Sequence, residues 1–179
     1  MASIWRAKVG WDPKHEVFDM IAILIALPSA LATAPVGDWI TEGAAVRDRL
    51  GTKLAAGDFD GDGYDDLAAS TGPGPAAAGI LVFRGGPGGL EVLPSWTIGL
   101  NAYEMMSMDA NDDGLDDLVV LNIINYYQLE IYYGSPTGFA AFPDWQRNLD
   151  VAGSMATGDI NGDGADDLLY TDPGALQYG

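Results

Sequence analysis

The chain has 179 residues, with 26 Asp and Glu against 8 Lys and Arg, and its formal net charge is −18. A balance this acidic argues against binding to nucleic acid, whose phosphates need Lys and Arg, and against attachment by charge to anionic lipid. The absence of Cys excludes a disulfide framework.

The first distinct segment is apolar and ends in small residues, between residues 20 and 34. It is short for a membrane span and resembles the core and cleavage region of a secretory signal peptide. Residues 30–32 and 32–34 both fit the A-x-A cleavage pattern, and the first is preferable because a cut after residue 34 would leave Pro35 beside the scissile bond. We therefore expect residues 1–34 to be a leader, with a buried N-terminal segment or a membrane anchor as alternatives.

Three acidic loops of nine residues follow, about fifty residues apart: loop 1 (58–66), loop 2 (109–117) and loop 3 (159–167). Each reads D-x-[DN]-x-D-G-x-x-D, with oxygen-bearing side chains at positions 1, 3, 5 and 9 and Gly at position 6. A hard cation explains this pattern, because Ca²⁺ takes six to eight oxygen ligands and Gly permits the sharp turn that brings them together. The carbonyl of position 7 can join the same shell.

We expect about three Ca²⁺ ions, one in each loop. The expected ligands in loop 1 are Asp58, Asp60, Asp62, the carbonyl of Tyr64, and Asp66. In loop 2 they are Asp109, Asn111, Asp113, the carbonyl of Leu115, and Asp117. In loop 3 they are Asp159, Asn161, Asp163, the carbonyl of Ala165, and Asp167.

The residues after each loop indicate which kind of calcium site this is. A helix–loop–helix site needs a bidentate acid at position 12, where this chain has Ala69, Val120 and Tyr170. The runs that follow the loops are short and apolar without a helical polar face, which is typical of buried strands. We therefore expect each loop to join two strands.

Other features recur in the same phase as the loops. A Pro-x-Trp triplet ends at Trp96 and at Trp145, thirteen and fourteen residues before loops 2 and 3, and Trp39 precedes loop 1. A G-x-P-x-G turn occupies residues 85–89 and recurs at residues 134–138. Pro presets φ in such a turn and Gly supplies a positive φ. A period near fifty residues with several short strands predicts propeller blades or a related β array.

On these loops, strands and turns, the units resemble FG-GAP (or VCBS-type) repeats, the calcium-bearing blades of integrin α-subunit β-propellers and of many exported microbial proteins. The resemblance runs from Trp39 to the C-terminus, although Asp112 of loop 2 stands where the other loops have Gly61 and Gly162. It implies an all-β fold: a partial β-propeller of about 2.5 blades with calcium-binding hairpin loops, preceded by the short apolar segment.

The repeats divide into three units by sequence. Repeat 1 spans residues 35–90, repeat 2 spans 91–139, and repeat 3 spans 140–179 and stops before a third G-x-P-x-G turn. A propeller needs roughly four to eight blades, and repeat units bury their faces only against neighbours. We therefore expect the remaining blades on a longer chain, with self-association of copies as the alternative.

The residues give little support to a catalytic centre. The only His is His15, upstream of the apolar segment, and no G-x-x-x-x-G-K-[ST] phosphate loop is present. Acids outside the loops could serve glycoside hydrolysis, but no spacing pairs any two of them. Trp39, Trp96 and Trp145 could stack on sugars, although their phase favours packing within blades.

We therefore expect a non-enzymatic, calcium-binding propeller segment that acts in extracellular recognition or adhesion. A leader, no Cys and calcium loops suit a bacterial or archaeal protein that is secreted or held at the cell surface, with an extracellular protein or carbohydrate as its ligand. The alternative is the non-catalytic propeller portion of a larger extracellular enzyme that acts on polysaccharide.

Overall fold

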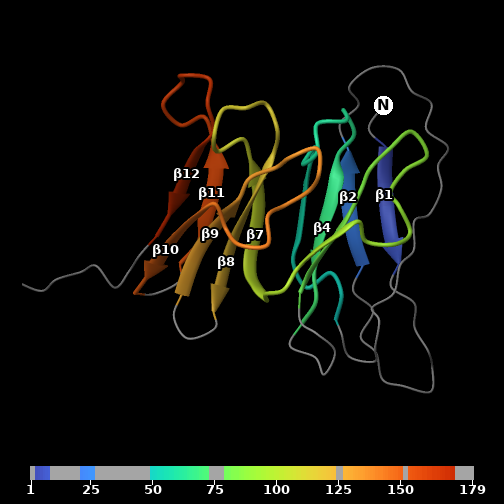
Figure 1. The fold of residues 1–179 in the computed structure, drawn as a ribbon, viewed down its shortest axis with the longest axis horizontal. Helices are drawn as coiled ribbons and strands as arrows, with labels where there is room; N and C mark the ends of the chain where they lie inside the picture. Colours follow the sequence, from blue (N-terminus) through green and yellow to red (C-terminus); the bar gives the residue numbers. More distant parts are fainter. Residues whose placement is uncertain are drawn as a thin grey trace, which may run out of the picture.

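A computed structural model describes residues 3–8, 21–26, 49–72, 79–123, 127–150 and 153–171. Every regular element in these ranges is a β-strand, as predicted (Figure 1). None of the described segments is a helix long and apolar enough to cross a membrane.

Two four-stranded antiparallel sheets and one hairpin carry the three acidic loops. Sheet 1 contains β3 (Leu54–Gly57), β4 (Asp66–Ser70), β5 (Ile80–Phe83) and β6 (Trp96–Ile98), in that order. Sheet 2 contains β7 (Ala102–Met108), β8 (Asp117–Ile123), β9 (Tyr127–Tyr132) and β10 (Trp145–Leu149). Hairpin 3 pairs β11 (Met155–Gly158) with β12 (Asp167–Tyr170). Each loop therefore joins two antiparallel strands, which confirms the prediction of strands on both sides.

The N-terminal residues form a separate strand pair. β1 (Ser3–Lys8) and β2 (Ile21–Ala26) are antiparallel, with Ser3 opposite Ala26. Strand β2 lies within the apolar segment expected to be the core of a leader. The leader over residues 1–34 stays a prediction, and most of these residues lie outside the described ranges.

Strands β6 and β10, which carry Trp96 and Trp145, are the last strands of their sheets, whereas the repeat bounds 91–139 and 140–179 imply that they are the first. Trp96 lies on β6 and pairs with Val82 of β5, and Trp145 lies on β10 and pairs with Ile131 of β9. Sheet 1 thus spans residues 54–98, whereas the sequence repeats were divided at residue 90. The repeat period determines how long a unit is, but not at which residue the unit begins. The G-x-P-x-G turn decides the boundary, because it folds the chain back so that the next strand pairs with the strand before the turn.

Strand β8 shows how the sequence divides between two cores. Leu118 and Val120 face the cluster between sheets 1 and 2, whereas Val119 and Leu121 face the cluster between sheet 2 and hairpin 3. All four side chains are buried. Alternate residues of a strand point to opposite faces, so a continuous apolar run is required wherever both faces are covered.

The aromatic side chains join sheet 1 to sheet 2. The ring of Phe139, after the second G-x-P-x-G turn, lies 5.1 Å from the ring of Phe59 and 6.2 Å from that of Trp96 between centroids. Trp96 packs against the cluster between these sheets, while Trp145 is 39% exposed. Trp39 lies outside the described residues.

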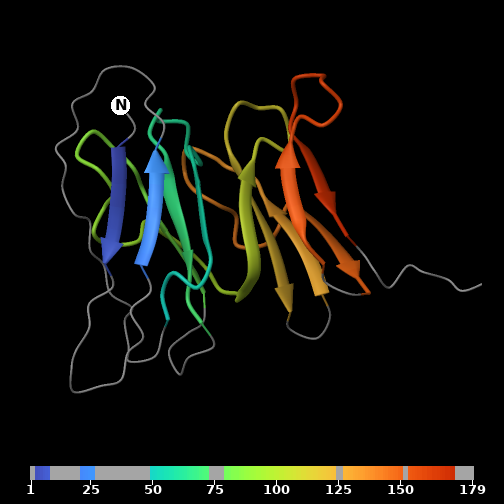
Figure 2. The ribbon, with the colours of Figure 1, turned by 180° about the vertical axis from the view of Figure 1, so that it is seen from behind.

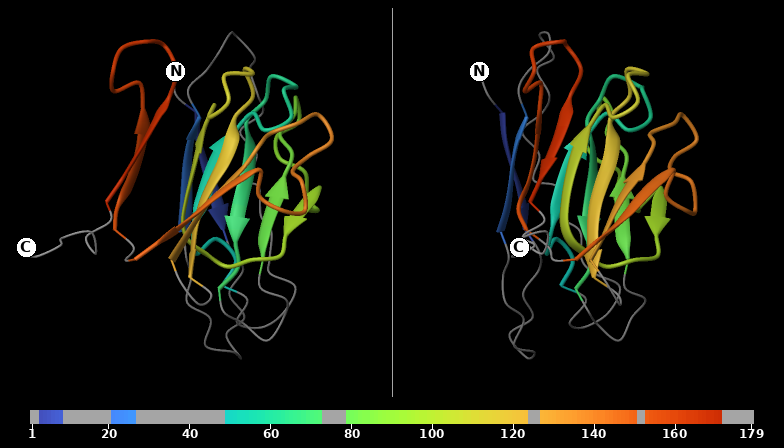
Figure 3. Two further views of the ribbon diagram at one scale, coloured as in Figure 1. Left: turned by 60° about the vertical axis from the view of Figure 1, so that its left-hand side comes forward. Right: turned by 90° about the vertical axis from the view of Figure 1, so that its left-hand side faces the viewer.

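The first strands of successive units lie side by side. Strand β3 contacts β7, and β7 contacts β11 (Figures 1 and 2). The Ser107 hydroxyl donates to the Ala56 carbonyl at 2.6 Å, and the Thr157 hydroxyl approaches the Ser107 carbonyl at 3.5 Å. These residues stand at the same place, two before the first Asp of each loop. The stacking brings the three loops to the same end of the molecule (Figure 3).

Candidate metal centres

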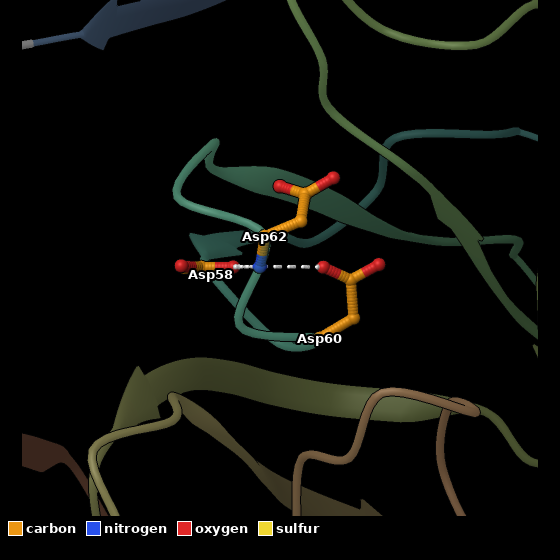
Figure 4. Close-up of side chains that lie close together, drawn as sticks. All are labelled: Asp58, Asp60 and Asp62. Carbon is orange, nitrogen blue, oxygen red and sulfur yellow. Dashed lines mark hydrogen bonds between the residues drawn. The ribbon is translucent and has the colours of Figure 1, made fainter.

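Loop 1 curls around the side chain of Asp58. Oδ1 of Asp58 accepts the amides of Gly61 at 2.9 Å and Asp62 at 3.0 Å, and Oδ2 accepts the amide of Gly63 at 2.9 Å. The Asp62 amide also donates to Asp60 at 3.1 Å, so it lies between the two carboxylates (Figure 4). As a result, one oxygen from each of Asp58, Asp60 and Asp62 lies within 4.8 Å of the other two.

Loops 2 and 3 repeat most of this bonding: the position 4 amide donates to the position 1 carboxylate in loop 3, at 2.7 Å, whereas the bonds to Asp109 in loop 2 come from positions 5 and 6. The position 1 carboxylates Asp109 and Asp159 accept the amides of positions 5 and 6 at 2.8 to 3.2 Å. In both loops the Asn side chain at position 3 accepts the position 5 amide, and the Asp at position 5 accepts the position 7 amide. The nine-residue motif is therefore sufficient to produce the same curl in three different sequence contexts.

Two backbone positions in each loop have a positive φ. The position 6 glycines have φ of 88°, 85° and 95° in loops 1, 2 and 3. At position 4, Gly61 and Gly162 have φ of 76° and 77°, and Asp112 of loop 2 has φ of 59°. Asp tolerates the left-handed region better than most non-Gly residues. Loop 2 therefore keeps the left-handed backbone at position 4, although its residue there is Asp112 and not Gly.

The position 9 carboxylates support the loops from beneath. Oδ2 of Asp66 accepts the Phe59 amide at 3.2 Å, and Oδ1 accepts the Gly85 amide at 2.7 Å at the end of the third strand. Asp117 is bonded in the same way to Ala110 and Gly134. Each carboxylate oxygen has a further lone pair. The expected role of position 9 as a metal ligand stays a prediction. The sequence analysis missed that Asp66 and Asp117 also tie each loop to the G-x-P-x-G turn, although Gly85 and Gly134 both begin that repeated turn.

Burial makes the charge of these carboxylates unfavourable. Asp66 is fully buried, and this burial is the main cause that raises its pKa from 3.8 to about 7. The Gly85 amide lowers that pKa, and the negative charge of Asp60 raises it. Burial also raises the pKa of Asp117, against the two amides that lower it. A cation is the group that would compensate such a cluster of anions.

Arg84 supplies one positive charge at loop 1. Its guanidinium forms an ion pair with Asp60, lies 3.9 Å from Oδ2 of Asp62, and covers the Trp96 ring at 5.5 Å from the centroid. Oδ2 of Asp60 is buried, and the Arg84 guanidinium is the group paired with it. The remaining donors of the loop are carboxylate and carbonyl oxygens, and an all-oxygen donor set fits a hard cation. In sheet 2, Tyr133 occupies the position that matches Arg84, directly before the G-x-P-x-G turn. This difference between the two repeats could have indicated the role of Arg84 from the sequence, and it was overlooked.

A further buried acid lies outside the loops. Glu130 accepts the Asn122 side-chain amide at 2.7 Å and the Tyr132 hydroxyl at 2.8 Å. Burial, followed by the bond to Glu130, raises the pKa of the Tyr132 hydroxyl, which therefore keeps its proton. Both oxygens of Glu130 are thus satisfied within sheet 2, which indicates a structural role.

Residues 50–83, which hold loop 1 and strands β3 to β5, match the family model of the FG-GAP repeat. The resemblance drawn from the motifs is confirmed over this stretch. No curated protein sequence matches the chain.

Proposed function

We propose, from the FG-GAP repeat at residues 50–83, that the chain is an exported calcium-binding β-propeller segment that acts in extracellular recognition or adhesion. The observation that carries this proposal is the common bonding of the three loops, which gathers the carboxylates of Asp58, Asp60 and Asp62 within 4.8 Å in loop 1. Side chains gathered in this way repel one another unless a cation lies between them.

Calcium suits these loops better than magnesium does. The donors are carboxylate, amide and carbonyl oxygens on a curved backbone, and Ca²⁺ accepts six to eight such ligands in flexible geometry. Mg²⁺ demands a near-octahedral shell and retains its waters. The proposed role of the metal is structural, because the loops join the first two strands of each unit and hold them in register.

The stacking of the sheets supports the propeller. The first strands β3, β7 and β11 lie side by side, and each sheet buries one face against the next. Blades of a propeller are related in this way around a central axis. We propose that sheets 1 and 2 and hairpin 3 are successive blades, completed by further blades of a longer chain or by other copies.

The location, partner and lack of activity complete the proposal. Extracellular modules bind Ca²⁺ at roughly 10⁻⁴–10⁻³ M, where the ion is abundant. The proposed ligand is an extracellular protein or carbohydrate, and the blades themselves are non-catalytic. The propeller portion of a larger polysaccharide-active enzyme is the alternative, and a catalytic domain encoded elsewhere in the same gene would favour it.

Calorimetric titration of the metal-stripped chain tests calcium binding. We expect about three Ca²⁺ per chain and weaker binding of Mg²⁺. Asp62→Ala removes a position 5 ligand and should abolish one site, whereas Asp65→Ala removes an exposed acid at position 8 and should retain all three. Fewer than two sites in the unmodified chain, a preference for Mg²⁺, or equal effects of the two variants would refute the assignment.

A further inference from the structure

Loops 1 and 2 are joined by a pair of hydrogen bonds between Asp58 and Asp116. The Asp58 amide donates to Oδ2 of Asp116 at 2.8 Å, and the Asp116 amide donates to the Asp58 carbonyl at 3.1 Å. Beside this pair, a Cβ placed on Gly61 would lie 2.5 Å from the Leu115 side chain. The two loops are therefore in direct contact, through positions 1 and 4 of loop 1 and positions 7 and 8 of loop 2.

One peptide group belongs to both loops. Its C=O is that of Leu115, an expected ligand of the second site, and its N–H is that of Asp116, which is bonded to Asp58. A peptide group is planar, so an N–H that is held in place also sets the direction of its C=O. Ordering loop 1 thus orders a ligand of loop 2.

The same bonds act on loop 1 in the other direction. Asp116 holds Asp58 at both its amide and its carbonyl. The Asp58 carboxylate is the hub of loop 1, since it accepts three amides of that loop. A metal that orders loop 2 therefore lowers the entropy cost of ordering Asp58, and this saving favours a metal in loop 1.

Loops 2 and 3 lack this connection. The approach of Asp116 requires Gly57, because a Cβ at that position would lie 2.7 Å from Oδ2 of Asp116. The residue matching Gly57 before loop 2 is Met108. In the described part of the chain, Asp166 forms no such pair of bonds with Asp109. In the part of the chain that the structure describes, this pair of hydrogen bonds thus joins loops 1 and 2 and not loops 2 and 3.

We propose that Asp116 is a positioning residue that couples the first two metal sites, so that each raises the affinity of the other while loop 3 binds independently. This inference rests on the proposed function. The coupling is reciprocal, because a change in one affinity by the second ion requires the same change in the other. Typical coupling free energies between two binding sites change each affinity by about 5-fold or more.

Nuclear magnetic resonance can follow the three sites separately in the full chain. The amides of Gly63, Gly114 and Gly164 each donate to the first Asp of their own loop. Their shifts during a Ca²⁺ titration report the occupancy of each loop. Asp113→Ala should abolish binding in loop 2 and weaken binding in loop 1 by about 5-fold or more, whereas Asp163→Ala should leave loop 1 nearly unchanged.

Two further variants separate coupling from a general loss of charge. Asp112→Gly removes an acid from loop 2 without removing an expected ligand, so loop 1 should keep its affinity. Asp116→Ala removes the side-chain bond to the Asp58 amide and keeps the backbone bond to the Asp58 carbonyl, so it should weaken the dependence of loop 1 on loop 2. Asp166→Ala is the matched control that should retain the full dependence. Asp116→Asn, which keeps an oxygen acceptor, should restore part of the coupling.

The outcomes distinguish this inference from the proposed function. Three loops that fill with Ca²⁺ while loop 1 is indifferent to Asp113→Ala would overturn the coupling and leave calcium binding intact. Glycine amides that do not respond to Ca²⁺ at all would overturn both. If Asp116→Ala fails to fold, the comparison of Asp113→Ala with Asp112→Gly still decides, because it uses the native contact.

Discussion

Asp66 makes the stability of the calcium-free protein depend on pH. Its carboxyl is fully buried, and burial with the nearby charge of Asp60 raises its pKa from 3.8 to about 7. The folded state therefore binds this proton more tightly than the unfolded chain does. The stability that the group contributes is present below its unfolded pKa and is lost as the pH rises through about 7.

The two pKa values determine the size of the effect. One pKa unit corresponds to about 1.36 kcal/mol, so the whole change is worth about 4 kcal/mol. Between about pH 5 and about pH 8, linkage gives a loss of about 2.5 kcal/mol in the free energy of unfolding. If loop 1 holds calcium as proposed, the ion should cancel this loss, because it would bind the ionised carboxylates and favour the state that is otherwise penalised.

Urea unfolding of metal-stripped protein at these two pH values measures the effect. Asp66→Asn should remove the part of the pH dependence that Asp66 contributes, while the buried Asp117 keeps its own part. The baseline stability of this variant is lower, because both Asp66 oxygens accept amides and Asn offers one acceptor. Asp65→Asn removes an adjacent exposed charge and accounts for the general repulsion of an acidic chain. A stability that rises from about pH 5 to about pH 8, or Asp66→Asn with an unchanged slope, would refute the reasoning.

Three further changes have defined outcomes. Arg84→Gln removes the cation paired with Asp60 and should raise the calcium affinity of loop 1 by up to about 5-fold, measured by titration; an unchanged or lower affinity would contradict this. Asp112→Gly relieves a non-Gly residue at φ 59° and should stabilise the protein by about 0.5–1 kcal/mol in urea, so a loss of stability would argue against strain there. Gly57→Ala places a Cβ 2.7 Å from a loop 2 carboxylate and should cost about 1–3 kcal/mol. Gly88→Ala, with open space around it, should cost much less; equal costs would rule out the clash.

The sequence by itself determined the loops, because their bonds are local. The Asp58 carboxylate bonds to amides three to five residues ahead of it, so the nine-residue motif contains both partners of every bond that curls the loop. The strands beside the loops and the G-x-P-x-G turns were predictable for the same reason. The Gly89 amide, for example, bonds to the carbonyl of Gly86 within its own turn.

Only the tertiary structure decided how the loops are supported and joined. Arg84, the residue after β5, reaches Asp60 of loop 1, and Asp116 reaches Asp58 across 58 residues of chain. Asp65 and Asp116 share position 8 of the motif, yet Asp65 is exposed whereas Asp116 is partly buried against the preceding loop. The motif is identical at both places, and the difference arises because the packing of sheet 2 on sheet 1 places a neighbouring backbone within hydrogen-bonding distance of Asp116.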